Sequence, residues 1–354
     1  MSEKTNAVKL HSVNKDVTIG SGNPVVVQTM LNKKPDDVEG NIEQALDCVK
    51  VGCEVIRFSV PNEVALITLK ELILSVPIPI VADIHFNHEM AIASAEAGAA
   101  KIRINPGNIG GFDKTREVVE VCKKTGCAIR VGVNAGSLEK EIAEREDLSF
   151  EEKLCESAKQ YCDFVAGDCD FENLVVSIKA HDVMSTVKAN RLFSEMLPEI
   201  PLHIGITEAG SAFQGLIKSG AGLGILLSEG IGDTIRISLT DDPQVEVRAA
   251  WQLLSALNLR RRGVEIISCP TCARTEVDII GIVREVEERL ATVTKPVKVA
   301  IMGCVVNGPG EAADADVGVA CGRGSAVLFS RGKIIKKVPE CEIVDALLEE
   351  VENR

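Results

Sequence analysis

The chain of 354 residues carries a net charge of −13 and is 45% hydrophobic, which fits one large globular domain and a smaller one. We do not expect nucleic acid as a partner, because there is no basic run, and one Trp, one Tyr and nine Phe offer little to stack bases on. The amino terminus is charged, and the longest apolar run, 72–82, holds two prolines and is too short to span a bilayer. We therefore expect a cytoplasmic protein without a signal peptide or membrane segment.

After a predicted hairpin at 8–20, strand-like runs alternate with helical ones. Eight such runs predict an α/β fold, a closed (β/α)8 TIM-type barrel, and the span 25–259 matches the roughly 250 residues typical of that fold. A doubly wound open sheet is the alternative, but no Gly-x-Gly-x-x-Gly follows a first strand, as its dinucleotide-binding version would require. The expected strands are 25–30, 54–60, 80–85, 101–105, 128–134, 174–179, 202–207 and 234–239.

The end of the barrel is ambiguous, because 222–228 also has the composition of a strand and could close it instead of 234–239. A glycine recurs where an expected helix returns to the next strand. Its left-handed backbone would end the helix at that point. The glycines in this position are Gly52, Gly98, Gly126 and Gly220.

A second, compact α+β unit is expected to begin at residue 261, which divides the chain into a barrel domain, 1–260, and a smaller domain, 261–354. Its predicted strands are 264–268, 298–302, 317–320, 326–330 and 333–338, with a last helix from Cys341. Residues 275–278 have the spacing of a capping box, and apolar residues follow at helical intervals, so a helix is predicted to begin there.

Three cysteines of this unit lie in loops that favour metal binding. Cys269 and Cys272 form a Cys-x-x-Cys pair, and Cys304 lies in a Gly/Pro-rich loop, so three soft thiolates could bind an iron-sulfur cluster or zinc. Glu311 is the nearest candidate for a fourth ligand, and Cys321 is the conventional alternative. The pair alone could also be a redox dithiol or half of a zinc site.

The remaining cysteines are scattered over a long chain, which indicates a reducing compartment rather than a disulfide framework. We expect them to be small buried hydrophobic residues. They are Cys48, Cys53, Cys122, Cys127, Cys155, Cys162, Cys169 and Cys341.

Charged residues occur within the expected barrel strands, whose carboxyl ends form the active site in this fold. Four arginines and one lysine would converge there, and because an unpaired buried cation is costly, they require an anion such as a diphosphate. The alternative is a structural network in which each arginine pairs with a carboxylate such as Asp83 or Glu208. The polar candidates are Arg57, Ser59, Asp83, His85, Arg103, Asn105, Arg130, Asn134, Lys179, His181, Asp182, His203, Thr207, Glu208, Arg236 and Ser238.

Seven motifs together give a resemblance that covers nearly the whole chain. The chain resembles the 4-hydroxy-3-methylbut-2-enyl diphosphate synthase family of the non-mevalonate isoprenoid pathway, in its short bacterial form. One departure is His181, where the family pattern has a Ser. The motifs are Val81-Ala82-Asp83-Ile84-His85-Phe86, Arg103-Ile104-Asn105-Pro106-Gly107-Asn108, Arg130-Val131-Gly132-Val133-Asn134, Ser177-Ile178-Lys179-Ala180, Gly205-Ile206-Thr207-Glu208-Ala209-Gly210, Cys269-Pro270-Thr271-Cys272 and Gly303-Cys304-Val305-Val306-Asn307-Gly308-Pro309-Gly310-Glu311-Ala312.

The resemblance implies reductive ring opening of 2-C-methyl-D-erythritol 2,4-cyclodiphosphate. Two electrons would come from ferredoxin or flavodoxin through a 4Fe-4S cluster. It also implies Glu208 as a catalytic acid and Cys269, Cys272, Cys304 and Glu311 as cluster ligands. The substrate-binding residues expected in the barrel are Arg57, Asp83, Arg103, Asn105, Arg130, Asn134, Lys179, His203, Thr207, Arg236 and Ser238.

Two other classes of function fit parts of the sequence. A barrel methyltransferase acting on a corrinoid or pterin would use the cysteine unit as a structural zinc module, and an iron-sulfur electron carrier would not use the barrel chemically. We also expect a homodimer with shared active sites. The last barrel helix, 244–259, should lead away from the barrel mouth, so the cysteine domain would be delivered to the mouth of a partner chain.

Overall fold

The computed structural model describes residues 4–207, 210–304, 312 and 314–354. The chain divides into two compact units, Met1–Arg260 and Arg261–Arg354. Each unit has its own hydrophobic core.

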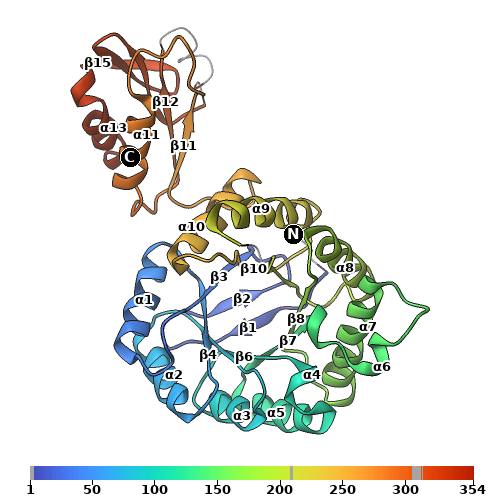
Figure 1. Cartoon of the computed structure of the whole chain (residues 1–354). Helices are drawn as coiled ribbons and strands as arrows, with labels where there is room; N and C mark the ends of the chain where they lie inside the picture. Colours follow the sequence, from blue (N-terminus) through green and yellow to red (C-terminus); the bar gives the residue numbers. More distant parts are fainter. Residues whose placement is uncertain (1–3, 208–209, 305–311, 313) are drawn as a thin grey trace. The chain divides into compact units, whose positions relative to one another are not determined.

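The first unit contains, within its described residues, eight parallel strands in the order β8-β7-β6-β5-β4-β3-β10-β9 (Figure 1). A parallel bridge between Val176 and Leu202 joins the two end strands, so the sheet closes into the predicted TIM-type barrel. The strands are β3 (Val26–Met30), β4 (Val55–Ser59), β5 (Ile80–Asp83), β6 (Lys101–Ile104), β7 (Ala128–Asn134), β8 (Leu174–Lys179), β9 (His203–Ile204) and β10 (Thr234–Ile235).

Helices surround the strands, and several begin where a side chain caps them (Figure 1). Asp37 accepts a hydrogen bond from Gly40 N, and Ser149 and Glu152 form a capping box. The helices are α1 (Val38–Lys50), α2 (Glu63–Ser75), α3 (His88–Glu96), α4 (Pro106–Ile109), α5 (Gly111–Thr125), α6 (Lys140–Ala143), α7 (Phe150–Cys162), α8 (Val183–Met196), α9 (Ala212–Ser228) and α10 (Pro243–Ala256).

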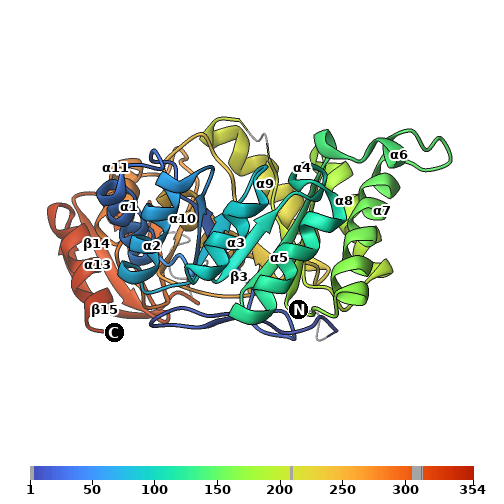
Figure 2. The same cartoon turned by 90° about the horizontal axis from the view of Figure 1, so that it is seen from below.

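The predicted hairpin is confirmed as β1 (Val8–Leu10) and β2 (Val17–Ile19), which pair antiparallel. It lies across one end of the barrel in the side view (Figure 2). Val8, Leu10 and Ile19 are fully buried, and they pack with apolar residues from the beginnings of the barrel strands, such as Val55 and Val81. The hairpin therefore closes the amino-terminal end of the barrel and leaves the carboxyl end as the mouth.

The alternative of a closing strand at 222–228 is wrong, because these residues belong to α9, and the barrel is closed by β10, which lies within the expected strand 234–239. Gly220 also lies inside α9, whereas Gly52, Gly98 and Gly126 have the expected positive φ. The glycines of α9 therefore do not mark a turn. Gly222 is required by packing, because a Cβ at this position would lie 2.7 Å from Ile206 Cδ1. A close approach of helix to strand, rather than a turn, requires this glycine.

The second unit contains a mixed sheet of five strands among its described residues, in the order β11-β12-β13-β14-β15. The two helices pack on one face of it, where Val286, Val299 and Leu347 belong to one core. The elements are β11 (Val264–Ser268), α11 (Ile279–Arg289), β12 (Val297–Met302), β13 (Val317–Gly322), β14 (Ser325–Ser330), β15 (Lys333–Pro339) and α13 (Ile343–Glu352).

Two predictions for this unit are wrong. The first helix begins at Ile279 and not at Thr275, because Asp278 is its N-cap and accepts a hydrogen bond from Gly281 N. Cys341 is exposed rather than buried, because it lies in the 3-10 turn Glu340–Glu342 before α13. The other seven cysteines expected to be buried are buried. No helix in the described part of the chain is both long and apolar enough to cross a membrane.

Candidate active site

The strands of the barrel alternate between apolar residues that face the helices and polar residues that face the interior. Ile56 and Phe58 pack in the core between strands and helices, so Arg57 between them points inward. Bulky aliphatic residues usually fill the interior of this fold, but here charged side chains do so. The inward charged or titratable residues at most 8% exposed are Arg57, Asp83, Lys101, Arg103, Arg130, Lys179 and His203.

Asp83 is the anionic centre of one part of this interior. Its carboxylate accepts hydrogen bonds from Arg57 Nη2 at 2.7 Å and Arg103 Nη1 at 3.3 Å, and it is fully buried. Burial by itself raises the pKa of Asp83, but the two arginines outweigh burial and lower the pKa to about 2. Asp83 is therefore ionised at neutral pH and holds both guanidinium groups in place.

A second buried carboxylate holds Arg236. Glu246 of α10 is 3% exposed, and its two oxygens lie 3.2 Å from Nε and Nη2 of Arg236. Thr29 Oγ1 donates to the same carboxylate at 2.6 Å. For Arg57, Arg103 and Arg236, the structural network considered as an alternative is thus present.

The carboxylates of the described residues leave other interior cations without a counter-ion. Arg130 is 1% exposed, and its Nε and Nη1 have no hydrogen-bond partner in the described part of the chain. No carboxylate of that part pairs with Lys179, and burial, followed by the charge of Arg130, holds the pKa of Lys179 well below its usual range. Arg130 is therefore a positive charge without a counter-ion among the described residues, and Lys179 beside it is a basic group that an anion would favour in its charged form, so both are suited to an anionic ligand.

The carboxyl ends of the strands add neutral hydrogen-bonding groups to these charges. With its amide oxygen turned toward Arg103, Asn134 accepts from Nη2 at 3.2 Å. Gly132 leaves room for this guanidinium, because a Cβ would lie 2.9 Å from Arg103 Nε. Asn105 is buried directly after β6, and Thr207 and Ser238 are half-buried after β9 and β10.

His203 differs from this group in position. It is the first residue of β9, so it lies toward the amino end of the strand and not at the mouth, where we expected it. Nδ1 lies 2.6 Å from Thr234 Oγ1, and Nε2 has no partner among the described atoms. Burial, followed by the charge of Arg130, holds the pKa of His203 well below its usual range, so the ring is neutral.

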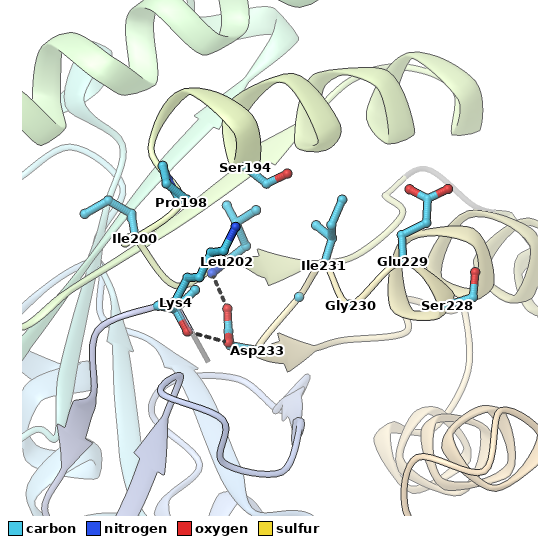
Figure 3. Close-up of a pocket in the computed structure, with 12 residues that line it drawn as sticks. Lys4, Ser194, Pro198, Ile200, Leu202, Ser228, Glu229, Gly230, Ile231 and Asp233 are labelled. Atoms are coloured by element: carbon cyan, nitrogen blue, oxygen red, sulfur yellow. Dashed lines mark hydrogen bonds between the residues drawn. The ribbon is translucent and has the colours of Figure 1, made fainter. Parts of the chain in front are cut away.

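A cavity of about 490 Å³ lies at the other end of the barrel (Figure 3). Asp233 in its wall accepts hydrogen bonds from Leu202 N and from Thr5 Oγ1. Both Leu202 and Asp233 directly precede a barrel strand, so the cavity is at the amino ends of β9 and β10. In this fold that end contributes to stability, and the chemistry belongs to the opposite end.

The cysteine loops follow the carboxyl ends of β11 and β12, which are neighbouring parallel strands. Gly303 N donates to Cys269 Sγ at 3.2 Å, and Glu276 N donates to Gly303 O, so the two loops are in contact. Backbone hydrogen bonding at Arg274 lowers the pKa of the exposed Cys272. Sulfurs that accept backbone N–H groups and favour the thiolate fit an iron-sulfur cluster. No set of three or more His, Cys, Asp or Glu side chains among the described residues is already arranged around a metal.

Cys321, the alternative fourth ligand, has a different environment. It is fully buried in the core between the sheet and the helices, and burial raises its pKa to about 12. These are the properties of a structural thiol. Glu311 lies outside the described residues, as does the expected catalytic acid Glu208.

Two buried residues of the site were not predicted from the sequence. Lys101 is fully buried in β6, two residues before Arg103, and the period-two pattern Lys-Ile-Arg could have revealed it. Glu246 lies beside Val247 and Ala250 on the buried face of α10. A carboxylate on an apolar helix face was the available signal.

The fold and the site define a TIM-barrel enzyme with a cationic interior, followed by a cysteine-containing α+β unit. A dihydropteroate synthase of Yersinia pestis has a TM-score of 0.52 at 14% identity, over 72% of this chain and 98% of that chain, which supports the barrel fold alone. The family model of the GcpE TIM-barrel domain matches residues 7–251, and that of the GcpE protein C-terminal domain matches residues 265–353.

Curated relatives match over almost the full length. The 4-hydroxy-3-methylbut-2-en-1-yl diphosphate synthase (flavodoxin) of Aquifex aeolicus (strain VF5) is 51% identical over 96% of this chain and 94% of its own. That of Sulfurihydrogenibium sp. (strain YO3AOP1) is 50% identical over 96% and 95%. The chain belongs to the 4-hydroxy-3-methylbut-2-en-1-yl diphosphate synthase family, a family of oxidoreductases, as the sequence motifs predicted.

Proposed function

We propose that this chain converts 2-C-methyl-D-erythritol 2,4-cyclodiphosphate to 4-hydroxy-3-methylbut-2-enyl diphosphate, a step in isoprenoid precursor biosynthesis. The observation that carries the proposal beyond family membership is that no carboxylate of the described residues pairs with the buried basic groups Arg130 and Lys179 in the barrel. A cyclic diphosphate supplies the missing negative charge. Flavodoxin, named in the relatives' activity, is the proposed electron donor, and ferredoxin is the alternative.

In this mechanism the barrel binds and orients the substrate. Arg57, Arg103, Arg130, Lys179 and Arg236 would contact the two phosphate groups, and Asp83 and Glu246 fix three of these arginines before the substrate arrives. The proposed neutral contacts at the mouth are Asn105, Asn134, Thr207 and Ser238, and His203, the first residue of β9, is left out of this set. Glu208 is proposed to donate a proton from its carboxyl group near the reacting carbons, because a carboxyl beside a dianionic ligand has a raised pKa.

The second unit is proposed to hold a 4Fe-4S cluster through Cys269, Cys272, Cys304 and Glu311. When bound, this cluster would relay the two electrons of the reduction from the electron donor to the substrate. The contact between the loops of Cys269 and Gly303 supports the three thiolates as ligands. The buried position of Cys321 supports a role in packing and leaves Glu311 as the fourth ligand.

The direct test is anaerobic turnover of the cyclic diphosphate with reduced flavodoxin, together with iron and zinc analysis. Formation of the linear diphosphate by an iron-containing protein is the expected result. Zinc in place of iron would favour the methyltransferase class, and iron without turnover would favour an electron carrier. Glu208→Gln should lower kcat by roughly 10²- to 10⁴-fold with the iron content unchanged. Arg130→Ala should mainly raise KM, by roughly 10- to 100-fold.

A homodimer with shared active sites is proposed from the course of the chain within the barrel. After α10, Arg260 donates to Val25 O at 2.5 Å and pairs with Glu54 at 2.7 Å, so the chain leaves the barrel at the amino ends of β3 and β4. The mouth is at the opposite end. Mixing Glu208→Ala and Cys304→Ser chains under subunit exchange should restore activity, because one site of each mixed dimer is intact. Inactive mixed dimers would show that each chain serves its own barrel.

A further inference from the structure

Lys101 is a buried lysine to which the proposed mechanism gives no role. It is the first residue of β6 and is fully buried, and Arg103 lies two residues further along on the same face. Its strand neighbours in register are Val81 and Ala128, which offer no charge. Nζ has no hydrogen-bond partner in the described part of the chain. Lys101 therefore lies inside the barrel, beneath the cations of the mouth.

The groups facing Lys101 are mostly cationic. Three buried carboxylates occur among the described residues: Asp83 bonds two arginines, Glu246 bonds Arg236, and Asp233 bonds groups at the amino end. None of them is left for the lysine. The charged or titratable groups that interact electrostatically with Lys101 are Arg130 from β7, Cys127 before β7, Arg57 from β4 and His203 from β9.

An ammonium group in this position would be one more unpaired buried cation. Isolated charges in protein interiors are unfavourable by several kcal/mol, and a lysine avoids this by losing its proton. Burial, followed by the charge of Arg130, holds the pKa of Lys101 well below its usual range. An anion bound among Arg57, Arg130 and Lys179 would reverse the electrostatic part of this effect.

We propose that Lys101 is a neutral amine in the anion-free barrel and takes up a proton when a diphosphate binds at the mouth. The proton comes from solvent, the Nζ lone pair accepts it, and no group is oxidised or reduced. The bound diphosphate then lies above an additional positive charge that is absent from the empty barrel. The inference rests on the proposed function in one respect, the binding of a diphosphate by the interior cations. Lys101 is then a positioning residue, because it carries a positive charge only while the anionic ligand is bound.

The test is calorimetric titration of the full-length protein with inorganic pyrophosphate at pH 8, in two buffers of different ionisation enthalpy. The difference between buffers gives the number of protons exchanged per pyrophosphate bound. The Lys101→Met variant should take up one proton fewer per pyrophosphate bound than the wild type does. The Lys70→Met variant, which is changed at an exposed position of α2, should take up the same number as the wild type. Unchanged proton uptake in Lys101→Met would overturn the inference and leave the anion site intact. Failure of the wild type to bind pyrophosphate would overturn the proposed anion site as well.

A second measurement uses the wild-type protein and does not depend on the folding of Lys101→Met. Lysines labelled with ¹³C at Cε give distinct NMR signals for amine and ammonium forms, and Lys101→Arg and Lys179→Arg assign the two buried residues. The Lys101 signal should be that of an amine without ligand and that of an ammonium with pyrophosphate. An ammonium signal for Lys101 in the ligand-free protein would overturn the inference.

Discussion

The barrel interior and the cysteine loops hold their functional side chains by different physical means. In the barrel, regular strands fix each backbone position, and Asp83 and Glu246 hold three arginines through buried ion pairs. In the second unit, Cys269 and Cys304 are half-buried and Cys272 is exposed, and all three lie in loops. The proposed anion site is thus organised before a ligand arrives, whereas the thiols of the proposed cluster site would need a bound group to bring them together.

The largest effect should come from removing a thiol ligand. Cys269→Ser should lose iron and activity together, because three cysteines provide the soft ligands of the proposed cluster. Pyrophosphate binding by the barrel should remain, since that site has its own supports. Cys341→Ser, an exposed cysteine in the same unit, is the matched control and should keep both iron and activity. Full iron content in Cys269→Ser would contradict the ligand assignment.

Removing the charge of Asp83, which pairs with two arginines inside the barrel, should destabilise the barrel rather than the second unit. Asp83→Asn removes the counter-charge of Arg57 and Arg103 and should lower the free energy of unfolding by roughly 3 kcal/mol. The exposed pair of Asp47 and Lys50 gives the control, because Asp47→Asn should change stability by less than about 1 kcal/mol. Urea unfolding of both variants measures the difference. Equal stability of the two would mean that the buried network does not support the fold.

Acid should weaken the same network in a defined range. The folded-state pKa of Asp83, about 2, is below the ordinary aspartate value of 3.8, so its stabilising contribution is complete above about pH 4. That contribution falls as the pH decreases from about 4 to about 2, and it amounts to roughly 2 kcal/mol. Asp83→Asn should flatten this part of the stability profile measured by urea unfolding. An unchanged acid dependence in the variant would assign the loss to other groups.

The smallest expected change in stability comes from substitutions that alter the packing of α9 on the barrel. Gly222→Ala should destabilise the protein by about 1 to 2 kcal/mol, because its Cβ would approach Ile206 Cδ1 to 2.7 Å. Gly220→Ala meets no atom within 4 Å and should stabilise the helix by roughly 0.5 to 1 kcal/mol. Thermal unfolding of the two variants provides the measurement. The same sign for both would show that close packing at Gly222 is not the reason for the glycine.

Sequence patterns predicted strand bounds and side-chain directions correctly where the local periodicity and turn residues agree with the fold. β7, β8 and β11 have their predicted bounds, because β7 and β8 are buried apolar runs and β11 is a half-buried one, each bounded by turn or loop residues. Period-two spacing also placed Arg57 and Arg103 on inward faces of their strands. The same patterns failed in α9, where the composition of 222–228 favours a strand and packing against Ile206 selects a helix with small residues.

By itself, the sequence determined the alternation of strands and helices, the inward direction of the charged residues and the loop positions of the cysteines, because these depend on periodicity and turn chemistry. Only the tertiary structure decided which charges neutralise one another. Asp83 and Arg103 are 20 residues apart, Thr29 and Glu246 are 217 apart, and each pair meets because the barrel closes. Three basic groups, Arg130, Lys179 and Lys101, have no carboxylate partner among the described residues, and this too follows from that closure, since a local sequence pattern cannot show which carboxylates reach a buried basic group.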